Sequence, residues 1–168
     1  MPSLTHQRIL RRFVHPVQTW LAEAERGEIV FAAHSMRLWP GKYREPDAML
    51  WLNEHKARMG ARESGPPDLV VEIISPSNEP HDTDTKVREY AQAGIPEYWI
   101  IQPLTRSISV YTLEGRAYRL FAQSGPGQRA HSLVLAGFEL VLNESVGTPI
   151  SRLQSLLGAA HDLRDGGH

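Results

Sequence analysis

Hydrophobic residues recur every three to four positions between Thr5 and Glu25, and the pattern stops before Gly27. This spacing places them on one face of an amphipathic helix. Pro16 interrupts the pattern, and proline lacks a backbone N–H and clashes with the preceding turn. We therefore expect a helix over this segment with a kink or a break near His15.

After Gly27 the pattern changes to short extended segments that read as antiparallel strands. They span residues 28–33, 36–39 and 46–50, with a turn at 40–42. A polar, weakly helical stretch over 53–62 then leads to a strand at 68–74, DLVVEII. Its almost continuous run of hydrophobic residues is typical of a strand buried on both faces.

A helix is expected over 82–93, because hydrophobic residues return at helical spacing and Gly94 can cap its end. Further strands are expected at 98–102, 107–113 and 118–123, then at 133–135 and 138–142, with a short helix at 150–157. Helices and strands thus alternate along one chain. The pattern predicts an α/β (α+β mixed) fold, with a mixed sheet flanked by helices.

Composition narrows the class of protein. The chain has 168 residues, of which 41% are hydrophobic and 22% charged, a formal net charge of −1 and no cysteine. We expect one domain over residues 1–168 with a disordered tail at 158–168, no disulfides and a cytoplasmic location. No hydrophobic run approaches the roughly 20 residues that cross a bilayer, so no membrane partner is expected. The charge neither favours nor excludes nucleic acid.

The strand at 68–74 carries a carboxylate, Glu72, among hydrophobic residues. Side chains alternate along a strand, so Asp68, Val70 and Glu72 share one face. A buried ionised carboxylate is costly unless it is paired or binds a metal. Glu72 therefore needs a partner.

Asp47 and Lys86 could converge on Glu72, from an earlier strand and from the helix that follows. Two carboxylates on neighbouring strands can hold a hard divalent cation, and a lysine can orient water or stabilise a charged transition state. This combination suits phosphodiester hydrolysis. By spacing alone the signal is weak, because carboxylate pairs are common. The histidines form no zinc-ligand pair, and no glycine-rich phosphate loop or nucleophile elbow is present.

Residues 67–101, PDLVVEIISPSNEPHDTDTKVREYAQAGIPEYWII, and residues 44–50, REPDAML, closely resemble the signature of the Uma family of restriction endonucleases, in the PD-(D/E)XK nuclease superfamily. The similarity runs from about His6 to Asn143. It implies a restriction-endonuclease-like core, with an active site on two central strands and an adjoining helix. By this resemblance we expect the family's usual N-terminal block to be missing, and Gln102 stands where the family commonly has aspartate.

The resemblance also implies roles for individual residues. Asp47 and Glu72 would bind Mg²⁺ or Mn²⁺, with the backbone carbonyl of Ile73 as a further ligand. The superfamily's usual lysine position is Ile74 here, so Lys86, from the helix, would be the catalytic lysine.

Four more residues match the family pattern or lie near it, and each has a simpler structural interpretation. Asp68 could support the site or be a turn residue, and Asp82 could be the N-cap of its helix. Tyr90 has the spacing of a core residue, although it also matches the motif. His6 could approach the site, but a surface histidine is the simpler interpretation.

Arg8, Arg11 and Arg12, near His6, could contact phosphates or simply solvate their helix.

The leading hypothesis is a Mg²⁺-dependent endonuclease that cleaves DNA and acts as a homodimer, since cutting both strands in one encounter needs two active sites. The alternative is a catalytically degenerate nuclease-fold protein that binds nucleic acid or protein. A third hypothesis, a hydrolase of small sugars or nucleotides, uses the same acid pair. The sequence does not distinguish DNA from RNA or single from double strands.

Overall fold

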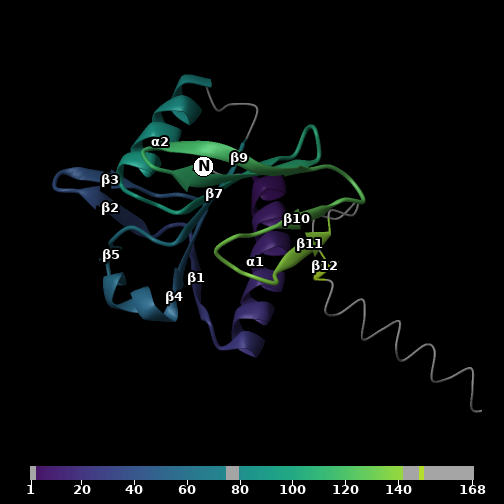
Figure 1. Ribbon diagram of the computed structural model, residues 1–168, viewed down its shortest axis with the longest axis horizontal. Helices are drawn as coiled ribbons and strands as arrows, with labels where there is room; N and C mark the ends of the chain where they lie inside the picture. Colours follow the sequence, from purple (N-terminus) through teal and green to yellow (C-terminus); the bar gives the residue numbers. More distant parts are fainter. Residues whose placement is uncertain (1–2, 75–79, 142–147, 150–168) are drawn as a thin grey trace, which may run out of the picture.

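The computed structural model describes residues 3–74, 80–141 and 148–149, and a six-stranded sheet forms its centre (Figure 1). In spatial order the strands are β1 (Gly27–Phe31), β4 (Ala48–Leu52), β6 (Leu69–Ile73), β7 (Glu97–Gln102), β8 (Ser107–Glu114) and β9 (Ala117–Ser124). The helices of the described residues are α1 (Leu4–Ala24), the 3₁₀ helix η1 (Asn53–Arg58) and α2 (Pro80–Gln92). This mixed sheet flanked by helices confirms the fold class expected from the sequence.

Two small sheets complete the described part of the chain. One contains β3 (Lys42–Arg44), β2 (Ser35–Trp39) and β5 (Glu63–Ser64), in that order. The other contains β10 (Arg129–His131), β11 (Glu139–Val141) and β12 (Thr148–Pro149). None of the described helices is long and apolar enough to cross a membrane.

Strand β6 lies at the centre of the large sheet and is buried along its whole length. It pairs antiparallel with β4 and parallel with β7, and α2 makes the crossover that a parallel pair requires. Leu69, Val71 and Ile73 face the core beneath α1, whereas Val70 and Glu72 lie on the opposite face, beneath α2. The expected buried strand is therefore the element that both helices cover.

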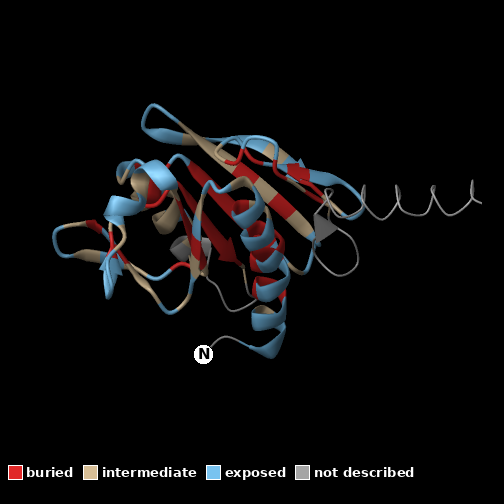
Figure 2. Cartoon of the chain, turned by 90° about the horizontal axis from the view of Figure 1, so that it is seen from below, coloured by how far each residue is buried: buried red, intermediate tan, exposed pale blue. Residues whose placement is uncertain are grey.

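Helix α1 packs one hydrophobic face on the sheet (Figure 2). Ser3 caps its start, and Phe13 meets Trp99 edge to face at 5.5 Å. Each large hydrophobic side chain buried here stabilises the fold by about 1.5–3 kcal/mol. The helix runs without interruption through Pro16, so the expected break is wrong. Pro16 is itself buried against the core, and this packing offsets the lost backbone hydrogen bond.

A second core lies between the sheet and α2, and includes Met49, Trp51, Val70, Tyr90 and Tyr98. The β2–β3 hairpin is joined to α2 through two cations, Lys42 and Arg44, which both bind Glu89. The sequence pattern did not predict β3. The helix also begins earlier than expected, at Pro80, because proline is well suited to the first turn, where its missing N–H costs nothing.

Glu97 anchors the last part of the described chain to the sheet. Its side chain is fully buried at the start of β7 and accepts hydrogen bonds from Trp99 Nε1, Ser132 Oγ and the backbone N–H groups of Leu133 and Val134. The strand expected over 133–135 is therefore wrong, because these N–H groups bind a carboxylate instead of another strand. The helix expected at 150–157 and the tail at 158–168 lie outside the described residues.

Candidate active site

Asp47 and Glu72 lie at the same end of two neighbouring strands. In the β4–β6 pair Ala48 lies opposite Val71, so Asp47, one residue earlier, falls opposite Glu72. The Ile73 N–H donates to Asp47 Oδ2 at 2.7 Å, where the strand ladder would otherwise continue. The Asp47 side chain is thereby fixed to β6, beside Glu72.

Glu72 is the most deeply placed acid of the site, with 5% of its surface exposed. The Tyr90 hydroxyl donates to Oε1 at 2.7 Å, and Lys86 Nζ donates to Oε2 at 3.1 Å. Burial raises the pKa of Glu72, and the charge of Asp47 adds to that rise, although Lys86 and Tyr90 oppose it. The side chain is held in a position where a proton or a cation is favoured.

Helix α2 brings Lys86 and Tyr90 to the site together. Residues four apart lie on one face of a helix, and this face of α2 covers Glu72. Tyr90 is fully buried and stacks edge to face on Tyr98 at 5.3 Å. Burial and the charge of Glu72 raise the Tyr90 pKa well above its ordinary value, so its hydroxyl stays a donor. Tyr90 is thus both a core residue and a partner of Glu72.

His6 reaches the site from the first turn of α1. Its Nε2 lies 2.8 Å from Asp47 Oδ1, and 13% of its side chain is exposed. Both oxygens of Asp47 therefore have partners, one from α1 and one from β6. The interpretation of His6 as a surface residue is wrong, because α1 crosses the sheet at the end where Asp47 lies.

Asp68 lies at the opposite end of β6 from Glu72. Its oxygens accept from the Leu52 N–H at 2.8 Å and bind His55 Nδ1 at 2.7 Å, and 2% of its surface is exposed. These bonds join β6 to the end of β4 and to η1, away from Glu72. Asp82 lies in the first turn of α2, inside the helix and not at its N-cap, and its side chain is outside the described residues.

Tyr98 also lies near the acid pair. The sequence indicated only that Tyr98 belongs to a hydrophobic strand. Tyr98 lies in β7 and pairs with Val70 of β6, on the sheet face that carries Glu72. Its buried hydroxyl has no hydrogen-bond partner among the described residues. Burial, Glu72 and Asp47 all raise its pKa, so it remains a neutral phenol beside the two acids.

The acid pair fits a hard divalent cation. Within residues 3–74, 80–141 and 148–149 no three histidine or acidic side chains converge as a metal site. Mg²⁺ nevertheless needs no such cage, since it commonly keeps several waters and binds one or two carboxylates. Two carboxylates held together supply suitable oxygens. Burial, with a smaller contribution from the charge of Asp47, raises the pKa of Glu72, and a bound cation would relieve this cost.

The comparisons with known proteins agree on the fold. A family model, Uma2, described as "Putative restriction endonuclease", matches residues 1–143. The crystal structure of a protein described as a putative nuclease belonging to DUF820, from Anabaena variabilis, superimposes with a TM-score of 0.65 and 16% sequence identity, covering 92% of this chain and 83% of that one. At that identity the likeness shows a shared fold. No curated protein matches the sequence.

Proposed function

Because this chain belongs to the Uma2 family, we propose that it is a metal-dependent endonuclease that hydrolyses phosphodiester bonds of DNA. The observation that carries the proposal is the convergence of Asp47, Lys86 and Tyr90 around Glu72 at the end of the two central strands. A carboxylate with a purely structural role would not need a second acid beside it, because the like charge only raises the free-energy cost of keeping the buried carboxylate ionised. Hydrolysis of a phosphodiester uses such a pair.

Asp47 and Glu72 would hold the metal, Mg²⁺ or Mn²⁺, with the Ile73 carbonyl as a further ligand. When bound, such a cation lowers the pKa of a coordinated water and neutralises charge on the phosphate. The Ile73 N–H and His6 fix both oxygens of Asp47, so the carboxylate cannot rotate away from β6. A ligand held in this way loses little freedom when the cation binds.

Lys86 is the proposed catalytic cation of the chain. Its Nζ lies 3.1 Å from Glu72 Oε2, and 19% of its side chain is exposed, so it is anchored at the acid pair yet reachable from solvent. From this place the ammonium can position the attacking water or stabilise the negative charge that develops on the phosphate. Tyr90 and His6 are positioning residues, since they act through Glu72 and Asp47.

One feature favours the alternative, a protein that binds nucleic acid through this fold without cleaving it. Each of the four oxygens of the acid pair already has a partner within the protein. A site closed in this way would hold its shape without a metal. Carboxylate oxygens carry two lone pairs, however, so these bonds leave room for a ligand.

A plasmid-nicking assay with Mg²⁺ and with Mn²⁺ tests the proposal. Wild type is compared with Glu72→Gln and Lys86→Met, and with Lys56→Met, which alters an exposed lysine on η1. We expect metal-dependent nicking that falls about 10²–10³-fold in the two site variants and stays unchanged in Lys56→Met. Equal nicking in all four proteins, or none with either metal, would contradict the proposal and favour the binding protein.

Three further points remain predictions: the small-substrate alternative, the homodimer and the cytoplasmic location. Turnover of small phosphodiesters with indifference to DNA would favour the third hypothesis, a hydrolase of small sugars or nucleotides. The homodimer is tested by sedimentation of the full chain with and without duplex DNA, and the cytoplasmic location by fractionation of the cells that make it.

A further inference from the structure

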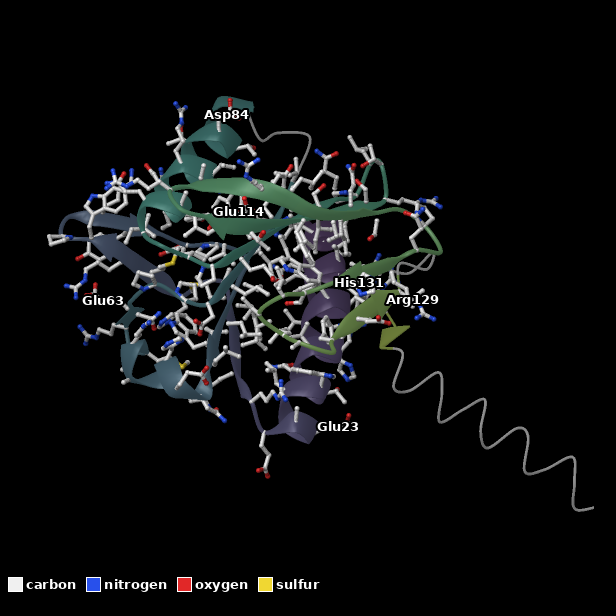
Figure 3. The ribbon with its side chains drawn as sticks, viewed as in Figure 1. Glu23, Glu63, Asp84, Glu114, Arg129 and His131 are labelled. Atoms are coloured by element: carbon white, nitrogen blue, oxygen red, sulfur yellow. The ribbon has the colours of Figure 1, made fainter. Side chains whose placement is uncertain are left out.

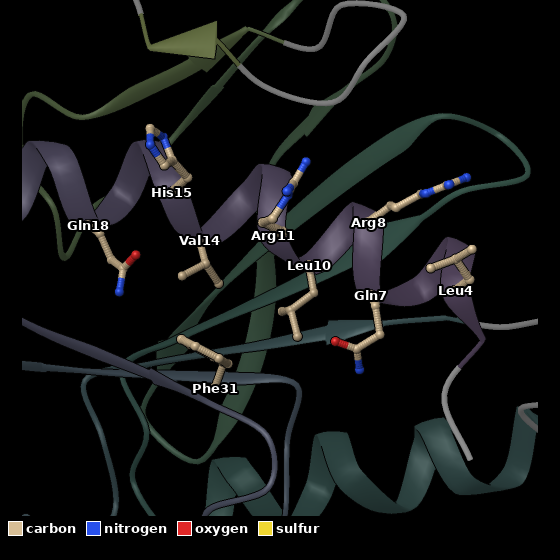
Figure 4. A pocket seen from close by; sticks show the side chains of 9 residues that line it. All are labelled: Leu4, Gln7, Arg8, Leu10, Arg11, Val14, His15, Gln18 and Phe31. Carbon is tan, nitrogen blue, oxygen red and sulfur yellow. The ribbon is translucent and has the colours of Figure 1, made fainter.

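A groove runs along α1 between the helix and the end of β1. It has a volume of about 650 Å³. In Figure 4, Leu10, Val14 and Gln18 point toward Phe31, while Arg8 and Arg11 extend outward from the helix. The groove therefore has an apolar floor with polar and cationic side chains along its edge.

The helix that forms the groove carries three arginines in its first half. Arg8, Arg11 and Arg12 are all exposed, and the first acidic residue of α1 is Glu23, at its carboxyl end (Figure 3). Within the described part of the chain these three arginines make no ion pair. Because the whole chain carries a net charge of −1, this local excess of positive charge is a property of the helix. It suits a polyanion.

The groove leads to the candidate active site. Gln7 lines it, and the preceding residue, His6, binds Asp47. On the other side, Phe31 pairs with Ala48, the residue after Asp47. Both walls of the groove thus continue into residues that hold the acid pair. A polymer lying in the groove would run toward the end of the sheet where His6 binds Asp47.

Two large hydrophobic side chains stay exposed in this groove: Phe31 at 49% and Leu4 at 66%. In a duplex the bases are stacked and paired, so their faces are not available to a side chain. In an unpaired strand each base can stack on an aromatic ring while arginines bind the phosphates. The combination of exposed ring and unpaired arginines therefore favours a single strand over a duplex.

We infer that the α1 groove binds an unpaired nucleic-acid strand, with Phe31 stacking on a base and Arg8 and Arg11 contacting phosphates, and directs that strand to the acid pair. The inference rests on the proposed function and refines it, because it names the substrate as single-stranded nucleic acid, or a single-stranded segment next to a duplex. A second copy of this chain is the competing occupant of the groove.

Fluorescence anisotropy with a labelled oligo(dT), measured in EDTA, tests binding apart from cleavage. We expect Phe31→Ala to weaken binding about 5- to 100-fold and Phe31→Trp to retain it. Leu120→Ala, at an exposed leucine of β9, is the matched control and should leave the Kd unchanged. The Phe31→Trp variant guards against a loss that reflects misfolding, as does a thermal melt of each protein.

Salt dependence tests the arginines. Replacing both Arg8 and Arg11 by alanine should reduce the slope of log Kd against log salt by about 1.4, as expected for two lost phosphate contacts on a single strand. Arg119→Ala, at an exposed arginine of β9 that pairs with Glu114, is the control.

Three results would overturn the inference. The first is an equal effect of Phe31→Ala and Leu120→Ala on oligo(dT) binding. The second is tighter binding of a duplex than of oligo(dT), with the same dependence on Phe31. The third is conversion of a dimer to a monomer by Phe31→Ala with no change in oligo(dT) affinity. Because binding is read in EDTA, a groove that binds without nicking contradicts only the proposed nuclease. Nicking that ignores Phe31 and the arginines contradicts only the groove.

Discussion

The hydroxyl of Tyr90 donates to Glu72 Oε1 at 2.7 Å, across the boundary between α2 and the central strand β6. This bond connects the packing of a helix to the protonation of an acid. Tyr90 also stacks on Tyr98, so packing in the core sets the position of its ring. The position of the ring in turn fixes where the hydroxyl lies. The site is therefore oriented by hydrophobic packing as well as by charge.

Tyr90→Phe should separate the two roles of this residue. The ring remains packed, but the hydrogen bond that lowers the Glu72 pKa is lost, so that pKa rises further. We expect the acid limb of the nicking pH profile to move to higher pH, and the free energy of unfolding to fall by about 1.5–3 kcal/mol at neutral pH. Tyr118→Phe, on β9, is the control, and a pH profile unchanged in Tyr90→Phe would contradict the role given to the bond.

Stability should depend on pH through Glu72. Its pKa is raised in the folded protein, mainly by burial, so the folded state binds its proton more tightly than the unfolded state does. The stability contributed by that proton is present at low pH and is lost as the pH rises from the ordinary glutamate value through the raised one. Glu72→Gln, which cannot ionise, should gain stability relative to wild type at about pH 8 and little at about pH 4.

Urea unfolding at both pH values measures this difference. Glu63→Gln, at an exposed glutamate of β5, provides the control, because an exposed carboxyl gains little from losing its charge. A Glu72→Gln protein that is less stable than wild type at the higher pH would mean that the bonds from Lys86 and Tyr90 outweigh the cost of burying the charge.

His6→Ala should weaken metal binding more than it weakens the fold. It removes the partner of Asp47 Oδ1 and leaves Oδ2 bound to the Ile73 N–H, so the carboxylate can rotate. We expect about a 10- to 100-fold rise in the Mg²⁺ concentration that half-saturates nicking, the range typical of lost support behind a metal ligand. His131→Ala, at a histidine that is 48% exposed, should change nothing. A lower maximal rate with unchanged metal dependence would place His6 in the chemical step instead.

Asp68→Asn should lower stability and spare activity. The substitution weakens the buried bonds to the Leu52 N–H and to His55, at the end of β6 away from Glu72. We expect a loss of about 1–3 kcal/mol in the free energy of unfolding and ordinary nicking below the melting transition. A variant that folds fully yet does not nick would give Asp68 a functional role that its position does not suggest.

The sequence predicted the centre of this molecule well. Glu72 stands out because it is a charged residue among hydrophobic ones, and alternation placed it on the same face as Val70. The structure shows that α2 covers this face. The sequence offered Asp47 and Lys86 as possible partners of Glu72, and the family resemblance gave them roles. The structure brings Lys86 to Glu72 and the Ile73 N–H to Asp47. These residues were accessible to prediction because strand periodicity and motif spacing are local properties of the chain.

The position of His6 could not be predicted in the same way. It depends on where α1 crosses the sheet, 41 residues from Asp47 in sequence, and no local pattern encodes that contact. The break expected at Pro16 is absent for a related reason, because burial by tertiary packing overrides a local helix-breaking signal. The segment at 133–135 has the composition of a strand, but its N–H groups bind Glu97, a residue from a distant element.

We expect a shortened chain to fold stably only if it keeps the hydrogen-bond partners of Glu97. A protein cut before Ser132 would keep all six strands of the large sheet, yet the carboxylate of Glu97, fully buried in the whole chain, would keep only Trp99 as a donor. Such a charge is costly without its hydrogen bonds, so the shortened sheet would be far less stable than its strand count suggests. For limited proteolysis and for the design of shorter versions, we therefore expect the boundary of the independently folding unit to lie beyond Val134, outside the sheet that carries the acid pair.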